Sequence, residues 1–268
     1  MSREQLSITL IQPDIRWEDK AANLLRYEAL IAGIREKKEV VVLPEMFSTG
    51  FSMAPERLAE RMDGPTLRWM KEMARQHRCI LAGSLIVEEE GRYYNRLIWM
   101  QPDGHFGSYD KRHLFAYGGE HEHYTPGNRR LIAQVKGWRI CLQVCYDLRF
   151  PVWARQARAA EEDGGDAAYD VLLYVANWPE RRSLAWKTLL QARAIENMCY
   201  TVGVNRVGTD GNGIYHSGDS SVFGPLGETI WQQAHDETAH TVVLDKAELS
   251  KTRSAFPFLR DADPFMLL

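Results

Sequence analysis

The chain has 268 residues, of which 45% are apolar and 26% are charged, and its formal net charge is −3. This length and composition predict a single domain over residues 1–268 with a substantial core, and they give no reason to expect nucleic acid or an anionic membrane as a partner. The N-terminal stretch lacks the long apolar run of a signal peptide, and no segment approaches the length of a membrane span.

Strand-like and helix-like segments alternate along the chain, which is typical of an α/β protein with mixed sheets. The first helix-like segment, residues 19–37, has Leu24, Tyr27, Ile31 and Ile34 on one face. Strands are predicted at residues 6–11, 40–43, 80–87, 94–100, 140–144, 171–175, 201–205, 220–223 and 241–244. Further helices are predicted at residues 65–78, 150–160 and 182–197, and a mobile surface loop at residues 161–166. Periodicity alone does not distinguish one doubly wound sheet from two stacked sheets.

Two polar residues follow predicted strands. A short β-branched run ends in Pro44, so Glu45 lies just past a buried strand. A carboxyl group held against apolar Pro, Met and Phe neighbours is a candidate general base, although a solvated loop residue is an equal alternative. Lys111 follows the strand at 94–100 and a Pro-Asp-Gly turn, and a basic loop residue is usually solvated.

Cys145 ends a stretch in which Ile140, Leu142 and Val144 share one parity, which predicts a strand. The Asp, Arg and Pro that follow predict the end of this strand and the approach to a helix. A thiol at such a junction can point into a cleft beside free backbone N–H groups. This geometry suits a nucleophile, and the ordinary alternative is a packed cysteine.

The other cysteines, Cys79, Cys141 and Cys199, have mainly apolar neighbours and are expected to be buried. None of the four cysteines lies in a CxxC arrangement. This pattern indicates a reducing, cytoplasmic setting without disulfides, and it offers no zinc site.

Taken together, these segments resemble the nitrilase, or carbon–nitrogen hydrolase, superfamily, whose catalytic set is Glu, Lys and Cys in that chain order. The matching residues are Glu45 in LPEMF, Lys111 in YDKRHLF and Cys145 in CYDLRFP. The family has an additional glutamate six residues before the Pro of a YxPG-like element, and that position is Glu120, not Glu122. The sequences of the ANWP, ARAIEN and VNRVG segments are most similar to those of the bacterial omega-amidase branch.

The resemblance covers nearly the whole chain, from Ile8 to about Phe265. It implies an αββα sandwich, in which two mixed sheets pack face to face and helices cover the outside. It also implies a homodimer, formed near the helix after Cys145 and near residues 182–197. The apolar stretch at residues 256–259 could reach the partner subunit.

The chemistry of these residues predicts acyl transfer through cysteine. Glu45 takes the proton of Cys145, and the thiolate attacks a carboxamide carbon. Lys111 and the backbone N–H of Tyr146 stabilise the oxyanion. Glu45 then protonates the departing ammonia and activates water against the thioester. The resemblance implies that Glu120 positions Lys111 and the substrate amide, and the reaction requires no cofactor or metal.

The omega-amidase resemblance implies a small-molecule substrate, a dicarboxylate monoamide such as 2-oxoglutaramate. Its remote carboxylate favours an Arg, and Arg149 and Arg181 could line the cleft, unless each forms a structural ion pair. Asn177 and Trp178 of ANWP are expected beside the same cleft. The alternatives are an N-carbamoyl amino-acid amidohydrolase or a nitrilase with the same residues, and a catalytically silent binding subunit. The intact Glu, Lys and Cys argue against the silent subunit.

Overall fold

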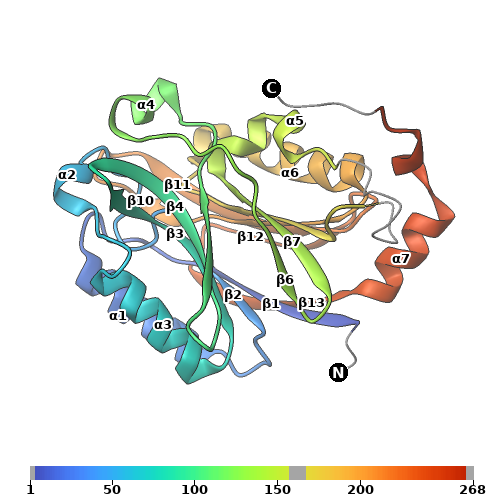
Figure 1. Ribbon diagram of the computed structural model, residues 1–268, viewed down its shortest axis with the longest axis horizontal. Coiled ribbons are helices and arrows are strands. Elements are labelled where there is room, and N and C mark those ends of the chain that lie inside the picture. The colour runs from blue at the N-terminus through green and yellow to red at the C-terminus, as the bar shows by residue number, and fades with distance from the viewer. Residues whose placement is uncertain (1–3, 157–166, 264–268) are drawn as a thin grey trace.

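The computed structural model describes residues 4–156 and 167–263, which form two β-sheets with helices outside them (Figure 1). The first sheet contains β1 (Gln5–Gln12), β2 (Val40–Val42), β3 (Ile80–Glu89), β4 (Arg92–Met100), β5 (Phe106–Asp110) and β13 (Thr238–Asp245). The second contains β6 (Ile132–Val135), β7 (Trp138–Val144), β8 (Val171–Val175), β9 (Tyr200–Val204), β10 (Val207–Thr209), β11 (Tyr215–Phe223) and β12 (Thr229–Ala234). The strand orders are β13-β1-β2-β3-β4-β5 and β10-β11-β9-β8-β7-β6, with β12 paired to β11. Both sheets mix parallel and antiparallel pairs.

Successive side chains of the first-sheet strands point to opposite faces of the sheet, so these strands contribute to two layers of the core. Leu6, Ile8 and Leu10 of β1 belong to the cluster that fills the space between the sheets. Ile11 and Val41 belong instead to the layer between this sheet and its covering helices. Strands buried on both faces have nearly continuous apolar sequences, which is why these runs were recognisable.

Helices cover both outer faces, which confirms the predicted αββα sandwich (Figure 1). Beside the first sheet lie α1 (Lys20–Gly33) and α3 (Pro65–His77), and beside the second lie α5 (Pro151–Ala154) and α6 (Ser183–Asn197). The remaining α-helices of the described chain are α2 (Pro55–Leu58), α4 (Glu120–His123) and α7 (Lys246–Ala255). Within residues 4–156 and 167–263, no helix combines the length and apolar character that crossing a membrane requires.

The elements that the sequence did not predict are short or largely exposed. The predictions omitted the short strands β5, β6, β10 and β12, which have few buried positions or only three residues, and the polar helix α7. The helix predicted at residues 150–160 is wrong in length, because α5 ends at Ala154 and residues 155–156 are not helical, while residues 157–160 lie outside the described residues. The loop predicted at residues 161–166 lies outside the described residues. The single-domain organisation stays a prediction.

Asp170 joins the second sheet to α7. Its carboxylate is 2% exposed and accepts hydrogen bonds from the backbone N–H of Arg139 at 3.0 Å, from Lys246 at 3.1 Å and from Arg253 at 3.2 Å. Burial alone would raise the pKa of Asp170, but the N–H and charge of Arg139 and the charge of Lys246 outweigh it and hold this pKa below its ordinary value of 3.8.

We expect Asp170→Asn to lower the free energy of unfolding by about 1–3 kcal/mol near pH 7, because three partly exposed cations lose their shared charge partner. A carboxyl group with a lowered folded-state pKa stabilises above its unfolded pKa, and this contribution disappears as pH falls through the folded value. Urea unfolding should therefore show that the difference in free energy of unfolding between the parent protein and Asp170→Asn narrows as the pH falls from about 5 to about 3. A difference independent of pH would contradict the charge argument.

Candidate active site

Strand ends from both sheets bring the predicted site residues together. Glu45 lies three residues after β2, and Lys111 directly follows β5, in the first sheet. Cys145 directly follows β7, and Asn177 lies two residues after β8, in the second sheet. The site therefore lies where the two sheets meet. Strand ends hold Glu45, Lys111, Cys145 and Asn177, whereas Glu120 lies on α4, between β5 and β6.

Lys111 lies between two carboxylates. Its ammonium contacts Glu45 Oε1 at 2.8 Å and Glu120 Oε2 at 2.8 Å, and all three side chains are 0% exposed. Burial alone would lower the pKa of Lys111, but the charges of Glu120 and Glu45 outweigh burial and raise it. Burial raises the pKa of Glu120, and the charge of Glu45 adds to that rise although Lys111 opposes it. Lys111 is therefore a charged lysine in a water-excluded position.

The surroundings of Glu45 differ from the apolar setting expected from its sequence neighbours. Besides Lys111, its carboxylate accepts hydrogen bonds from Asn95 Nδ2 at 2.8 Å and from the backbone N–H of Asn177 at 2.8 Å. The charge of Glu45 also contributes to the raised pKa of the Cys145 thiol, after burial. Polar donors thus hold the Glu45 carboxylate on several sides. Cys145, whose thiol interacts with this carboxylate, lines the cavity.

Cys145 has a left-handed backbone, with φ of +44°, and begins the 3₁₀ turn Cys145–Arg149. Burial raises the pKa of its thiol well above the ordinary value, and the charge of Glu45 adds to this rise. The thiol is therefore protonated at neutral pH, and it could become a nucleophile only if a base accepted its proton. The turn is held by Asp147, whose carboxylate accepts the backbone N–H of Val144 at 3.0 Å and of His113 at 2.9 Å.

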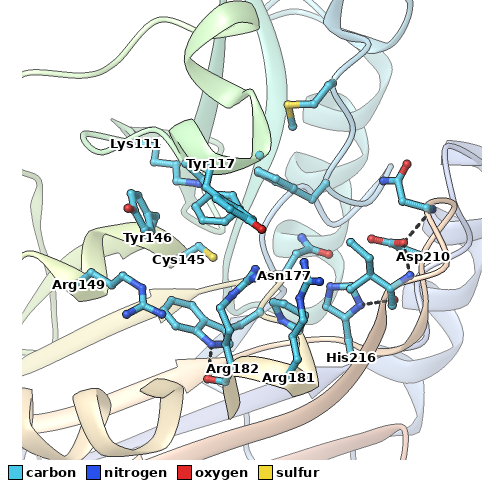
Figure 2. Close-up of a pocket in the computed structure, with 18 residues that line it drawn as sticks. Lys111, Tyr117, Cys145, Tyr146, Arg149, Asn177, Arg181, Arg182, Asp210 and His216 are labelled. Carbon is cyan, nitrogen blue, oxygen red and sulfur yellow. Dashed lines mark hydrogen bonds between the residues drawn. The ribbon is translucent and has the colours of Figure 1, made fainter. Parts of the chain in front are cut away.

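A cavity of about 280 Å³ opens above Cys145 and Lys111 (Figure 2). Its lining includes every substrate-binding residue predicted from the sequence, namely Tyr146, Arg149, Asn177, Trp178 and Arg181. Glu45 and Glu120 lie behind it and do not line it. The lining residues that the sequence prediction missed are Phe51, Met53, Phe115, Tyr117, Gly118, Pro179, Arg182, Asp210, Asn212, Ile214 and His216.

Three guanidinium groups line this cavity, from Arg149, Arg181 and Arg182 (Figure 2). Among the residues that the structure describes, none of the three forms an ion pair, so the structural ion pairs considered as alternatives are absent there. Arg149 lies over the ring of Trp178 at 5.0 Å, and Arg182 over the ring of Phe115 at 5.1 Å. Burial lowers the pKa of Arg182, and the charge of Arg181 adds to this effect. An anionic group in the cavity would offset the repulsion between the positive charges of Arg181 and Arg182.

Comparison with known proteins agrees with this geometry. Residues 7–255 match the family model of carbon–nitrogen hydrolases. The chain is 45% identical to Omega-amidase YafV of Escherichia coli K12, with 98% of each chain covered, and 29% identical to 2-oxoglutaramate amidase of Bacillus subtilis, with 95% and 96% covered. The crystal structure of a carbon–nitrogen hydrolase superfamily protein from Xanthomonas campestris, with an arsenic adduct in its active site, gives a TM-score of 0.95 at 45% identity. It covers 98% of this chain and 99% of its own. The chain therefore belongs to the carbon–nitrogen hydrolase family and is an enzyme that hydrolyses carbon–nitrogen bonds.

Iodoacetamide is expected to modify Cys145 before the other cysteines, because Cys145 lines the cavity beside a base. Cys79, Cys141 and Cys199 are at most 2% exposed, whereas Cys145 is 9% exposed and faces the cavity. Peptide mass spectrometry after brief labelling checks this order, with Cys145→Ala as the control. Faster labelling of another cysteine in the folded protein would show that Cys145 is not the accessible thiol.

Proposed function

We propose that this enzyme is an omega-amidase, which hydrolyses the terminal carboxamide of dicarboxylate monoamides such as 2-oxoglutaramate to the acid and ammonia. The observation that supports this substrate class most is the set of guanidinium groups from Arg149, Arg181 and Arg182 in the cavity of Cys145. A guanidinium that forms no ion pair within the described chain offers two parallel hydrogen bonds to a substrate carboxylate. The identities to Omega-amidase YafV and to 2-oxoglutaramate amidase give separate support.

In the proposed acylation step, Glu45 accepts the proton of Cys145 while the sulfur forms a bond to the carboxamide carbon. The carbonyl electron pair moves to oxygen, where the ammonium of Lys111 and the backbone N–H of Tyr146 stabilise the negative charge. The carbon–nitrogen bond then breaks, the proton on Glu45 passes to the leaving nitrogen, and ammonia departs from a thioester.

In the proposed deacylation step, water loses a proton to Glu45 and adds to the thioester carbon. The carbon–sulfur bond breaks, and the proton returns to the sulfur of Cys145. Addition of water forms a second oxyanion, which the ammonium of Lys111 stabilises as it did the first. Glu120 acts as a positioning residue, because its carboxylate holds the ammonium of Lys111 at 2.8 and 3.0 Å and does not line the cavity.

We also propose a cytoplasmic homodimer. The four free cysteines suit a reducing compartment. The predicted interface region carries exposed apolar side chains, with Val152 of α5 52% exposed and Leu184 and Ile195 of α6 77% and 49% exposed. A second copy would remove this surface from water.

We expect the purified enzyme to release ammonia from 2-oxoglutaramate faster than from an N-carbamoyl amino acid or an aliphatic nitrile, and Cys145→Ala to abolish release. Replacing Arg149 or Arg181 by Ala should lower kcat/KM for 2-oxoglutaramate by roughly ten- to a hundred-fold, since a hydrogen bond to a charged group contributes about 1.5–3 kcal/mol. Arg182→Ala should act in the same direction, because its guanidinium enters the same cavity.

The control substrate is pentanamide, which lacks the carboxylate and should be affected much less by these substitutions. Equal losses on both substrates would show a structural arginine. Unchanged kinetics in all three variants would place the carboxylate elsewhere and favour the carbamoylase or nitrilase alternatives. No turnover of any of these substrates would show that the enzyme acts on another class of carbon–nitrogen bond.

Sedimentation equilibrium is expected to give twice the chain mass at micromolar concentrations. Leu184→Glu should shift this equilibrium toward the monomer, because it places a charge at the most exposed apolar position of α6. Leu25→Glu is the matched control, since Leu25 is 68% exposed on α1, away from the proposed interface. A monomeric parent protein would contradict the proposal.

A further inference from the structure

Asn95 of β4 lies between the two carboxylates of the site. The side chain amide donates one hydrogen bond to Glu45 Oε1 at 2.8 Å and one to Glu120 Oε1 at 3.2 Å. Asn95 is 1% exposed, and its backbone carbonyl accepts the N–H of Lys111 at 3.0 Å. A single residue therefore contacts both glutamates and the main chain of the lysine between them.

The orientation of this amide is fixed by a chain of hydrogen bonds. The backbone N–H of Met46 donates to Ser84 Oγ at 2.8 Å, so the hydroxyl hydrogen of Ser84 is free to donate elsewhere. It donates to Asn95 Oδ1 at 2.8 Å. Because the amide oxygen is thereby committed to Ser84, the amide nitrogen must face the carboxylates, and both of its hydrogens are used.

We propose that Asn95 is a positioning residue for the amidase reaction, which holds the carboxyl groups of Glu45 and Glu120 in place on either side of Lys111. Two like charges in a buried site favour uptake of a proton by one of them. The Asn95 amide donates a hydrogen bond to each carboxyl group but carries no charge of its own. It therefore holds both groups in place and leaves Glu45 able to accept a proton.

Besides Asn95, the titratable groups that the described chain places near this pair come from three further segments. They are the ammonium of Lys111, the thiol of Cys145 and the phenol of Tyr124, whose pKa is raised by burial and by the charge of Glu120. Lys111 cannot replace the amide, because the ammonium is a charged donor already shared between the two carboxylates. Asn95 does not line the cavity, so its effect on substrate must pass through the glutamates.

The test is Asn95→Leu, which keeps a similar volume and removes both donors. We expect kcat to fall by about ten- to a hundred-fold, as a displaced base would cause, while KM changes little. The acid limb of the kcat/KM profile should move to higher pH by about one unit, because the donors that favour the ionised pair are gone. Ser84→Ala keeps the amide but releases its orientation, so it should give a smaller movement in the same direction.

Asn197→Leu is the matched control. Asn197 is a 0% exposed asparagine of α6, away from the site, that donates to the backbone carbonyl of Arg193 at 3.0 Å. Its loss should lower the melting temperature without moving the acid limb. If Asn95→Leu does not fold, Ser84→Ala carries the test. Folded variants at Asn95 and Ser84 with the acid limb of the parent protein would overturn the proposal.

This inference rests on the proposed function, and one readout separates their failures. The rate of Cys145 alkylation by iodoacetamide at different pH values requires no knowledge of the substrate. If 2-oxoglutaramate is not hydrolysed but the alkylation profile of Asn95→Leu moves to higher pH, the role of Asn95 stands and the substrate proposal fails. If 2-oxoglutaramate is hydrolysed and neither profile moves, only the role of Asn95 fails.

Discussion

The site depends on keeping one lysine charged out of contact with water. Lys111 is stabilised there by Glu45 and Glu120, both of which are fully buried. Buried ion pairs lose much of their Coulombic gain to desolvation, so such a cluster persists only when further hydrogen bonds satisfy each partner. The amide of Asn95 and the backbone N–H of Phe115, at 2.6 Å from Glu120, supply those bonds. Burial and the charge of Glu45 raise the pKa of the Cys145 thiol beside this cluster, so the sulfur becomes a thiolate only if a base accepts its proton.

The two stacked sheets supply the rigidity that this cluster requires. Glu45 and Cys145 leave strands of different sheets, and each is at or next to a left-handed residue, Met46 with φ of +43° and Cys145 with φ of +44°. Such conformations are unfavourable for side chains larger than glycine, so the surroundings must hold them in place. Ser84 holds the first turn through the N–H of Met46, and Asp147 holds the second through the N–H that precedes Cys145.

The strands that precede Glu45 and Cys145 could be predicted from the sequence for a physical reason, whereas the stacking of the two sheets and the roles of these residues followed from the resemblance to carbon–nitrogen hydrolases. Glu45 follows a short run of buried valines, and Cys145 follows a strand in which every second residue is apolar. Such runs are visible without knowledge of their partners. Asn95 and Arg182 were not predicted because nothing local distinguishes them. Asn95 contacts residues 50 and 25 positions away in the chain, so its role exists only once the strands pair. Arg182 could have been suspected only from its place beside Arg181.

The central claim is that catalysis passes through a thioester on Cys145, and hydroxylamine tests it most directly. Hydroxylamine attacks thioesters readily, so an acyl-enzyme formed from 2-oxoglutaramate should be diverted to the hydroxamate. The account predicts hydroxamate at the expense of the acid, in a proportion that rises with hydroxylamine concentration, and none with Cys145→Ala. Turnover that yields only the acid at every hydroxylamine concentration would contradict it.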